Sequence, residues 1–171
     1  VQEHYLRDDI WCSVECCSLC SQTESVLSTS ALLTKHIPRP HYIIPDTNVF
    51  MNQIDVIEHP ALHDVIVLQT VYEELRHLSL PIYNRLRALI SDQKKRFYVF
   101  SNEHHRDTYI QRLKDESPND RNDRAIRSAV KWYSTHLKKM TNKGSHNEVV
   151  LLTDDVGNRT KAQEEGLLAF S

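Results

Sequence analysis

The chain has 171 residues, of which 40% are hydrophobic and only three are Gly, so it can bury the core of a compact domain and is neither disordered nor collagen-like in composition. No apolar run approaches the ~20 residues that a membrane helix needs, and no membrane partner is expected. The formal net charge of −2 lacks the basic excess of many nucleic-acid-binding domains. RNA is not excluded, because metal ions bound to acidic residues could supply positive charge locally.

The N-terminal 20 residues are charged and then rich in cysteine. All four cysteines lie between Cys12 and Cys20, whereas a secreted disulfide scaffold would spread them through the fold. The clustering favours a reducing compartment and metal ligation. Cys12, Cys17 and Cys20 supply three thiolates, one fewer than a closed tetrahedral zinc site needs. Because Cys16 adjoins Cys17 and is poorly placed to bind the same ion, we expect a fourth ligand from a distant segment.

Residues 21–40 are rich in Ser and Thr and end in two prolines, a pattern typical of a linker. From residue 41 onward, short apolar runs alternate with amphipathic stretches. We therefore predict a cysteine-rich extension and linker over residues 1–40 and a folded domain over residues 41–171.

The apolar runs predict five strands, and the amphipathic stretches between them predict six helices. The strands are expected at 41–46, 64–68, 96–100, 148–155 and, more weakly, 167–170; the helices are expected at about 48–58, 70–78, 81–92, 103–113, 122–139 and 157–165. Asp120 or Asn122 could cap the helix at 122–139. Strands that alternate with helices favour an α/β fold whose parallel sheet is covered on both faces.

Acidic residues follow several of these strands. Asp46 closes the first strand and Asp154 and Asp155 close the fourth, while Glu73 and Glu74 lie early in the helix after the second; Asp120 and Asp123 lie at the start of the long helix. In an open parallel sheet, ligands gather at the carboxyl ends of the strands. Two carboxylates ~5 Å apart repel by roughly 3 kcal/mol at an effective dielectric near 20, so protons or divalent cations must neutralise such a group.

A carboxylate cluster of this kind suits Mg²⁺ or Mn²⁺ and could activate water for attack on phosphorus. Each acidic residue, taken singly, is also explained by helix capping and loop solubility. The joint pattern also fits a receiver-like phosphoacceptor site. Spacing alone leaves these interpretations open.

Several motifs together resemble a known family. They are EHYLRDDI (3–10) with the cysteines that follow, PDTNV (45–49), VIVLQTV (65–71), NEHHRDTY (102–109), NDRNDRAIR (119–127) and KWYSTHLKK (131–139). In this order they resemble the N-terminal part of the catalytic ribonuclease subunit of the eukaryotic RNA exosome. The resemblance implies a three-layer α/β/α PIN fold with a central parallel sheet of about five strands and a zinc-clamped N-terminal extension. It also implies an endonuclease that cuts single-stranded RNA with two Mn²⁺ or Mg²⁺ ions and leaves 5′ phosphates.

The resemblance also assigns roles to individual residues. The metal-binding, catalytic acids would be Asp46, Glu74, Asp123 and Asp155, the second member of each neighbouring acidic pair. Supporting positions around them would be Asn48, Thr153, Asp120 and Asp154, although turn formation explains Asn48 and Thr153 equally well. A related subunit in which these acids are replaced is inert, and because all four are present here we expect activity.

For the zinc site, the resemblance implies His136 as the fourth ligand, with His4 as the runner-up. His136 lies four residues after Trp132 on the same helical face, so a packing role is also open. A structural Zn²⁺ would clamp an N-terminal tail without a core of its own onto the long helix. His104 and His105 are adjacent, so their side chains should point apart, and no role is assigned to them.

RNA contacts and partners complete the predictions. Arg121, Arg124 and Arg127 flank Asp123 and could hold phosphates, although a solvated helix face is the simpler interpretation. The resemblance implies that the tail and the domain surface dock the subunit onto the barrel core subunits of the exosome, that a full-length chain continues into an exonuclease module, and that the protein resides in the nucleus and nucleolus, with the cytoplasm left open. A docking module is therefore the second function hypothesis.

Overall fold

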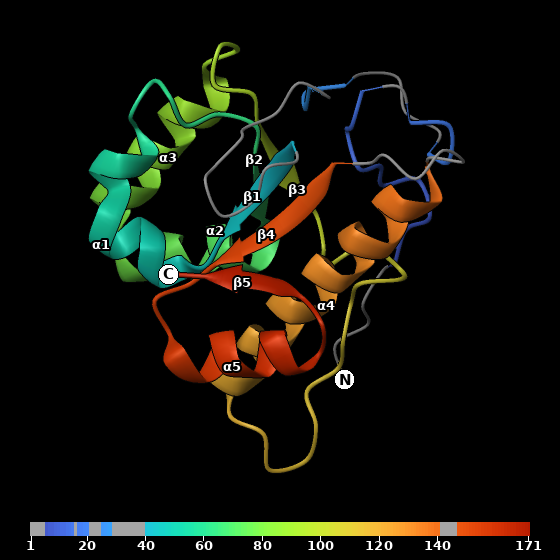
Figure 1. Cartoon of the computed structure of the whole chain (residues 1–171). Coiled ribbons are helices and arrows are strands. Elements are labelled where there is room, and N and C mark those ends of the chain that lie inside the picture. Colours follow the sequence, from blue (N-terminus) through green and yellow to red (C-terminus); the bar gives the residue numbers. More distant parts are fainter. Residues whose placement is uncertain (1–5, 16, 21–24, 29–39, 141–146) are drawn as a thin grey trace.

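A computed structural model describes residues 6–15, 17–20, 25–28, 40–140 and 147–171. Five strands and five helices follow one another over these residues (Figure 1). In chain order they are β1 (His41–Pro45), α1 (Thr47–Ile57), β2 (Val65–Leu68), α2 (Gln69–Leu78), α3 (Leu80–Ser91), β3 (Phe97–Phe100), α4 (Pro118–Lys139), β4 (Glu148–Leu152), α5 (Val156–Glu164) and β5 (Leu168–Phe170).

The strands form one parallel sheet in the order β3-β2-β1-β4-β5. Every residue of β1 and β2 is buried, as expected of strands covered on both faces. Helices α1, α2 and α3 lie on one side of the sheet, and α4 and α5 lie on the other (Figure 1). The α/β fold with a five-stranded parallel sheet is therefore confirmed. Among the described residues, no helix combines the length and apolarity needed to span a bilayer.

The long helix begins earlier than the sequence predicted. It starts at Pro118, and the Ser117 hydroxyl accepts a hydrogen bond from the Asp120 backbone N–H at 3.0 Å. The prediction that Asp120 or Asn122 caps this helix is wrong. Serine is a preferred N-cap residue, and proline at the first helical position brings a φ angle suited to the helix, so the Ser-Pro pair takes this role.

The helix predicted over residues 103–113 is also wrong, because this segment folds into turns. Its backbone bonds to the N-terminal extension: Arg7 donates to the carbonyl of His104 at 2.7 Å, and Arg106 donates to the carbonyl of Arg7 at 3.1 Å. The Thr108 hydroxyl donates to the carbonyl of Asn102 at 3.0 Å. These non-local and side-chain hydrogen bonds satisfy backbone groups that a helix would otherwise use.

The described part of the N-terminal extension packs into the core. Cys12, Val14 and Leu27 are at most 2% exposed and belong to the same hydrophobic cluster as the sheet. The hydroxyl of Tyr133 on α4 donates to the carbonyl of Cys12 at 2.9 Å. The expectation of a tail without a core is thus wrong here, because its apolar side chains share the core of the domain. The predicted boundary at residue 40 stays a prediction, and most of the proposed linker lies outside the described residues, as does His4.

Candidate active site and zinc site

Asp46 follows β1 and Asp155 follows β4, and the order in which the chain adds strands to the sheet reverses between these two strands. The chain runs from β1 through β2 to β3 on one side and then returns to β4 on the other. The Asp46 N–H donates to the carbonyl of Leu152 at 2.8 Å, so the β1–β4 ladder carries Asp46 to the sheet edge. Asp155 follows β4, and its Oδ1 caps α5 by accepting from the Asn158 N–H at 2.9 Å. Ligand sites of open parallel sheets form at such switch points.

The Asp46 carboxylate is 4% exposed and tightly held. Its Oδ1 accepts from the Thr47 N–H at 2.7 Å, and its Oδ2 accepts from the Thr153 hydroxyl at 2.8 Å and from Asn158 Nδ2 at 3.3 Å. The Thr153 oxygen also accepts from the Asp155 N–H at 3.1 Å. Thr153 therefore joins two acidic segments, so the contact supports the orienting role predicted for it.

Glu74 on α2 and Asp123 on α4 face the same region. The Thr47 hydroxyl donates to Glu74 Oε1 at 3.2 Å. Burial, together with the charges of Asp46 and Asp123, raises the pKa of Glu74 to about 7. Burial likewise raises the pKa of Asp123 to about 6, with contributions from Asp46 and Asp155. The charge of Asp46 thus acts on both Glu74 and Asp123, and the charge of Asp155 acts on Asp123.

Within the described part of the chain, none of these four carboxylates forms a salt bridge. Buried anions without paired cations are costly, and hard oxygen donors are the ligands that Mg²⁺ and Mn²⁺ prefer. The donor set therefore fits divalent cations. Among the described residues, the acids do not form a group as compact as the cysteine cluster described below.

The neighbouring acids are placed differently. Glu73 is exposed and accepts from Gln69 Nε2 at 3.0 Å, and Asp154 accepts from Gln53 Nε2 at 3.2 Å. Asp120 and Asn48 are exposed. The roles predicted for Asp154, Asp120 and Asn48 stay predictions.

Two contacts to the acids were missed from the sequence, namely those of Thr47 and Asn158. Each has a local signal: Thr47 follows Asp46 directly, and Asn158 lies three residues after Asp155, at the position whose N–H an N-cap side chain binds. Arg127 Nη1 donates to Asn158 Oδ1 at 2.7 Å, which orients the Asn158 amide toward Asp46.

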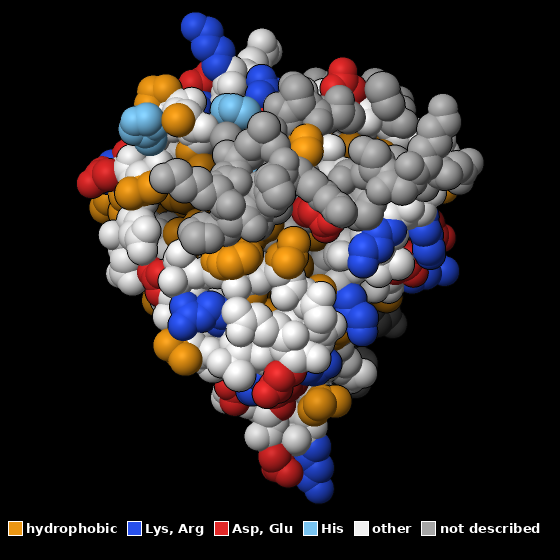
Figure 2. Space-filling view, viewed as in Figure 1, with side chains coloured by type: hydrophobic (Ala, Val, Ile, Leu, Met, Phe, Trp, Pro, Cys, Tyr) orange, Lys and Arg blue, Asp and Glu red, His pale blue; other side chains and the backbone are white. Residues whose placement is uncertain are grey.

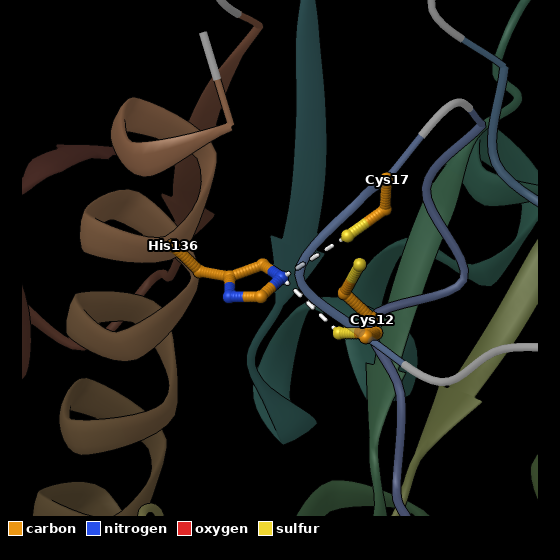
Figure 3. Close-up of side chains that lie close together, drawn as sticks. Cys12, Cys17 and His136 are labelled. Carbon is orange, nitrogen blue, oxygen red and sulfur yellow. Dashed lines mark hydrogen bonds between the residues drawn. The ribbon is translucent and has the colours of Figure 1, made fainter.

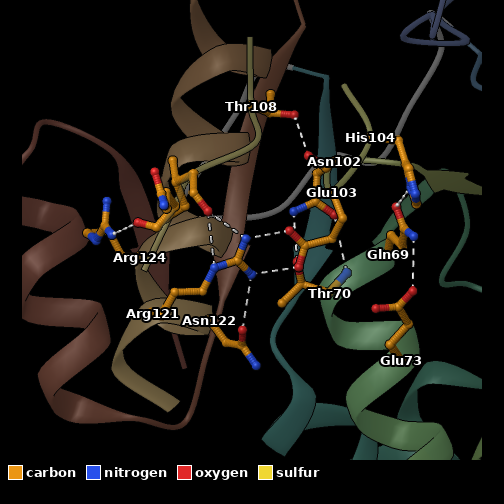
Figure 4. Close-up of polar contacts among 12 residues, drawn as sticks. Gln69, Thr70, Glu73, Asn102, Glu103, His104, Thr108, Arg121, Asn122 and Arg124 are labelled. Atoms are coloured by element: carbon orange, nitrogen blue, oxygen red, sulfur yellow. Dashed lines mark hydrogen bonds and ion pairs between the residues drawn. The ribbon is translucent and has the colours of Figure 1, made fainter. Parts of the chain in front are cut away.

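The three arginines beside Asp123 are engaged within the chain. Arg121 pairs with both oxygens of Glu103 at 2.6 Å (Figure 4). Arg124 pairs with both oxygens of Glu116 at 2.9 Å. Arg127 is 7% exposed, so for this residue the solvated-face interpretation is wrong. Phosphate binding by the three stays a prediction. On the face shown in Figure 2, basic and acidic side chains are interspersed and form no single basic surface.

We predict that the effect of divalent metal on stability depends on pH. Glu74 and Asp123 have ordinary pKa values of 4.5 and 3.8, so between about pH 4 and 7 these two groups bind more protons in the metal-free folded chain than in the unfolded chain. Their contribution to stability therefore falls as pH rises. Metal binding needs the charged carboxylates. Thermal unfolding should show a larger Mn²⁺-induced rise in Tm at pH 7.5 than at pH 5.5.

The Glu74→Gln/Asp123→Asn double variant provides the control, since it removes two repelling charges. Its metal-free Tm at pH 7.5 should exceed that of the unmodified chain, and the Mn²⁺-induced rise should largely disappear. An equal Mn²⁺ effect at both pH values, or one that survives in the double variant, would contradict the shared electrostatic site.

The described cysteines and His136 form a second, more compact group. The ligand atoms of Cys12, Cys17, Cys20 and His136 all lie within 4.8 Å of one another. His136 points from α4 toward the cysteine sulfurs (Figure 3), with Nε2 at 3.5 Å from Cys17 Sγ and 3.3 Å from Cys20 Sγ. In tetrahedral zinc, bonds of about 2.3 Å to sulfur and 2.1 Å to nitrogen place S and N about 3.6 Å apart. The Cys3His cluster thus fits Zn²⁺.

The environment of the cluster favours thiolate formation at one cysteine. A hydrogen bond from Cys12, together with His136, lowers the pKa of Cys20 to about 4, against the opposing effect of burial. The Cys12–Cys20 hydrogen bond and burial raise the pKa of Cys12. His136 also stacks on Trp132 at 4.4 Å between ring centroids. The two roles left open for His136, packing and ligation, are therefore compatible: one ring face packs while Nε2 faces the sulfurs.

We predict that the purified chain contains one equivalent of zinc and that Cys17→Ser or His136→Ala lowers this content to well below half. Loss of the ion should release the extension from α4 and make it sensitive to limited proteolysis, since structural zinc sites contribute folding free energy directly. Elemental analysis measures the zinc, with His77→Ala, an exposed histidine on α2, as the control. Unchanged zinc in both cluster variants would rule out the clamp.

Comparison with known proteins agrees with this architecture. Residues 43–171 match the PIN domain family. The chain is 50% identical to the exosome complex exonuclease RRP44 of Mus musculus and 48% identical to that of Homo sapiens; each alignment covers 100% of this chain and 18% of the relative. The chain thus spans less than a fifth of the length of these curated relatives. A solved structure of the T. brucei RRP44 PIN domain is 29% identical and superposes with a TM-score of 0.81, covering 97% of this chain and 88% of that one. The chain belongs to the PIN domain family, in the form found at the N-terminus of the exosome exonuclease RRP44 and carrying a Cys3His cluster.

Proposed function

We propose that this chain is an endoribonuclease domain that hydrolyses single-stranded RNA with two Mn²⁺ or Mg²⁺ ions and leaves 5′ phosphates. One observation carries the proposal: Asp46, Glu74, Asp123 and Asp155 come from four segments, influence one another electrostatically, and form no salt bridge among the described residues. Membership of the PIN domain family implies a nuclease-type function, and PIN domains generally use divalent metals.

The protein's own contribution is to hold its oxygen ligands in place before substrate arrives. Asp46 is fixed by three hydrogen bonds and Glu74 by one from Thr47, so little reorganisation is needed on binding. Bound divalent cations would lower the pKa of the attacking water and stabilise charge on the leaving 3′ oxygen. No serine or histidine nucleophile is needed. Because Glu74 and Asp123 hold protons more tightly than usual, deprotonation of these two residues would couple activity to pH.

The phosphoacceptor interpretation is less well supported. A carboxylate that accepts a phosphoryl group needs an accessible oxygen for the attack. Asp46 is 4% exposed, and each of its oxygens accepts at least one hydrogen bond from within the chain. This geometry suits a fixed ligand better than a nucleophile.

Docking is a second function compatible with the first. The relatives are exosome exonucleases, and the extension is attached to the domain both at the Cys3His cluster and through the Arg7–His104 backbone contact. We infer that this composite surface helps to bind the barrel core subunits of an exosome, beside an exonuclease module in the full-length protein, and that the protein resides in the nucleus and nucleolus.

The nuclease proposal predicts that Asp123→Asn slows cleavage of a circular single-stranded RNA in Mn²⁺ by on the order of 100-fold or more, since loss of a ligand charge weakens metal binding. A circular substrate reports internal cuts alone, and end-labelling of the products tests for 5′ phosphates. Glu164→Gln, which changes an exposed acid on α5, is the control and should stay within about twofold of the unmodified chain. Full activity of Asp123→Asn would remove the site assignment.

The docking proposal predicts that a change in the zinc cluster, rather than in the acidic site, weakens binding to the exosome core. In pull-down assays with exosome core subunits, the full-length protein carrying Cys17→Ser should bind more weakly, because the freed extension loses its fixed position, while Asp123→Asn should bind normally. Undiminished binding of Cys17→Ser, in protein shown to have lost its zinc, would exclude the extension as part of the interface.

A further inference from the structure

A cavity of about 370 Å³ lies between the start of α2, the loop after β3 and the start of α4, and it has no part in the hydrolysis proposed above. It is lined by residues of the first turn of α2, the loop after β3 and the start of α4, among them Gln69, Glu73, Glu103, Tyr109, Arg112 and Arg121. This volume lies within the range of small-ligand pockets. We call this cavity the Gln69 pocket.

Two helices that line the pocket, α2 and α4, also carry Glu74 and Asp123. Glu73 precedes Glu74 on α2, and Arg121 lies two residues before Asp123 on α4. The charge of Glu103 is among those that raise the pKa of Glu74. A ligand in the Gln69 pocket would therefore contact the two helices that carry Glu74 and Asp123.

One wall of the pocket is formed by Arg121, whose N–H groups already donate to acceptors within the chain. Arg121 has five N–H groups, and its five hydrogen bonds go to both Glu103 oxygens, the carbonyl of Ile110 (twice) and Asn122 Oδ1 (Figure 4). The Thr70 hydroxyl also donates to Glu103 at 2.9 Å. The Arg121 guanidinium lies 5.7 Å from the centroid of the Tyr109 ring. This wall presents a positioned aromatic ring rather than a free charge, a feature of sites that stack nucleic-acid bases.

The opposite wall presents a fixed polar edge. Gln69 Nε2 donates to Glu73 Oε1 at 3.0 Å, and Gln69 Oε1 lies 3.1 Å from His104 Nδ1 (Figure 4). The side-chain amide is thus held at both ends. Glu73 keeps a second carboxylate oxygen, and Gln69 keeps a second amide hydrogen for a ligand. A carboxylate accepts hydrogen bonds from the amino groups of bases.

Arg112 supplies a cation at the rim. It is exposed, lines the pocket, and forms no ion pair or hydrogen bond within the described parts of the chain. By contrast, Arg121 and Arg124 are held by Glu103 and Glu116. Arg112 is therefore better placed than either to meet the phosphate of a bound strand.

From this arrangement we propose that the Gln69 pocket binds one nucleotide of the RNA next to the scissile phosphate. The base would stack on Tyr109, its amino-bearing edge would face Glu73 and Gln69, and its phosphate would face Arg112. Guanine fits best, because its two adjacent N–H donors can each meet one Glu73 oxygen, and Oε1 keeps a lone pair beside its bond from Gln69. Uracil fits least, because it has no amino group. This inference rests on the proposed nuclease function and adds base selectivity to it.

The test maps cut sites in a random-sequence single-stranded RNA in Mn²⁺. The unmodified chain should cut with guanine favoured over uracil at one fixed position beside the cut, by about threefold to tenfold for a solvent-exposed contact. Glu73→Gln should reduce this bias to below about twofold while cutting continues. Glu164→Gln, which changes an exposed acid on α5, should leave the bias intact.

A binding measurement separates base contacts from phosphate contacts. In the Asp123→Asn background with Mg²⁺, fluorescence anisotropy should show that a labelled G-rich oligonucleotide binds more tightly than a U-rich one. Arg112→Ala should weaken both oligonucleotides by the same factor and reduce the salt dependence, since phosphate contacts carry no sequence information. Lys114→Ala, an exposed neighbour that does not line the pocket, is the matched control. Glu73→Gln should abolish the ranking.

The outcomes distinguish this proposal from the nuclease function. Cleavage with no base preference, or a preference that survives Glu73→Gln, would overturn the base site and leave the nuclease function standing. Absence of cleavage by the unmodified chain would overturn the nuclease function. The relative affinities for the two oligonucleotides would then test the pocket by themselves, and equal affinity for both would overturn the base site.

Discussion

The repulsion among four carboxylates is the constraint on which the candidate active site depends. Burial raises the pKa of Glu74 and Asp123, so the charged state of this group is unfavourable in the absence of cations. The fold can hold it because Asp46 and Asp155 are attached to β1 and β4, neighbouring strands joined by a continuous ladder. Thr153 and Asn158 both donate hydrogen bonds to Oδ2 of Asp46. The sheet therefore holds the carboxylates in an arrangement that divalent cations would stabilise. Because the free energy of bringing them together is supplied by folding, little reorganisation would be needed during the reaction.

Helix α4 links this site to the zinc cluster. Asp123 lies near its start and His136 in its last turn, and 13 residues at ~1.5 Å each place them about 20 Å apart along one rigid element. The two ends carry different chemistry: oxygen donors suit Mg²⁺ or Mn²⁺, whereas thiolates and imidazole suit Zn²⁺. The difference in ligand softness would by itself favour a different metal at each end of the helix. Zinc at one end would fix the extension against the helix whose other end carries Asp123 of the candidate active site.

The sequence revealed the parts of this molecule that local patterns determine. Buried parallel strands are continuous apolar runs, so β1 to β4 and the acids that close them could be placed from periodicity. The segment after β3 could not, because its backbone bonds to Arg7, about 100 residues earlier in the chain, and no local pattern reports such a partner. The same holds for the contact between Asn158 and Asp46, which depends on the sheet register. The family resemblance, rather than spacing, selected Glu74 over Glu73 and His136 over His4.

The arrangement of the arginines bears on how RNA would be held. Arg121 and Arg124 bind Glu103 and Glu116, and Arg127 binds Asn158 and Glu165, so these residues brace the acid-bearing helix and the loop before it. Freeing Arg121 for phosphate would leave Glu103 half-buried and unpaired, which is costly. In a chain with a net charge of −2, divalent cations at the candidate site would supply much of the positive charge near it, with Arg112 at the rim of the Gln69 pocket as a further cation. RNA affinity should accordingly depend more on the divalent cations than on many lysine–phosphate or arginine–phosphate contacts, which would otherwise produce a steep dependence on salt.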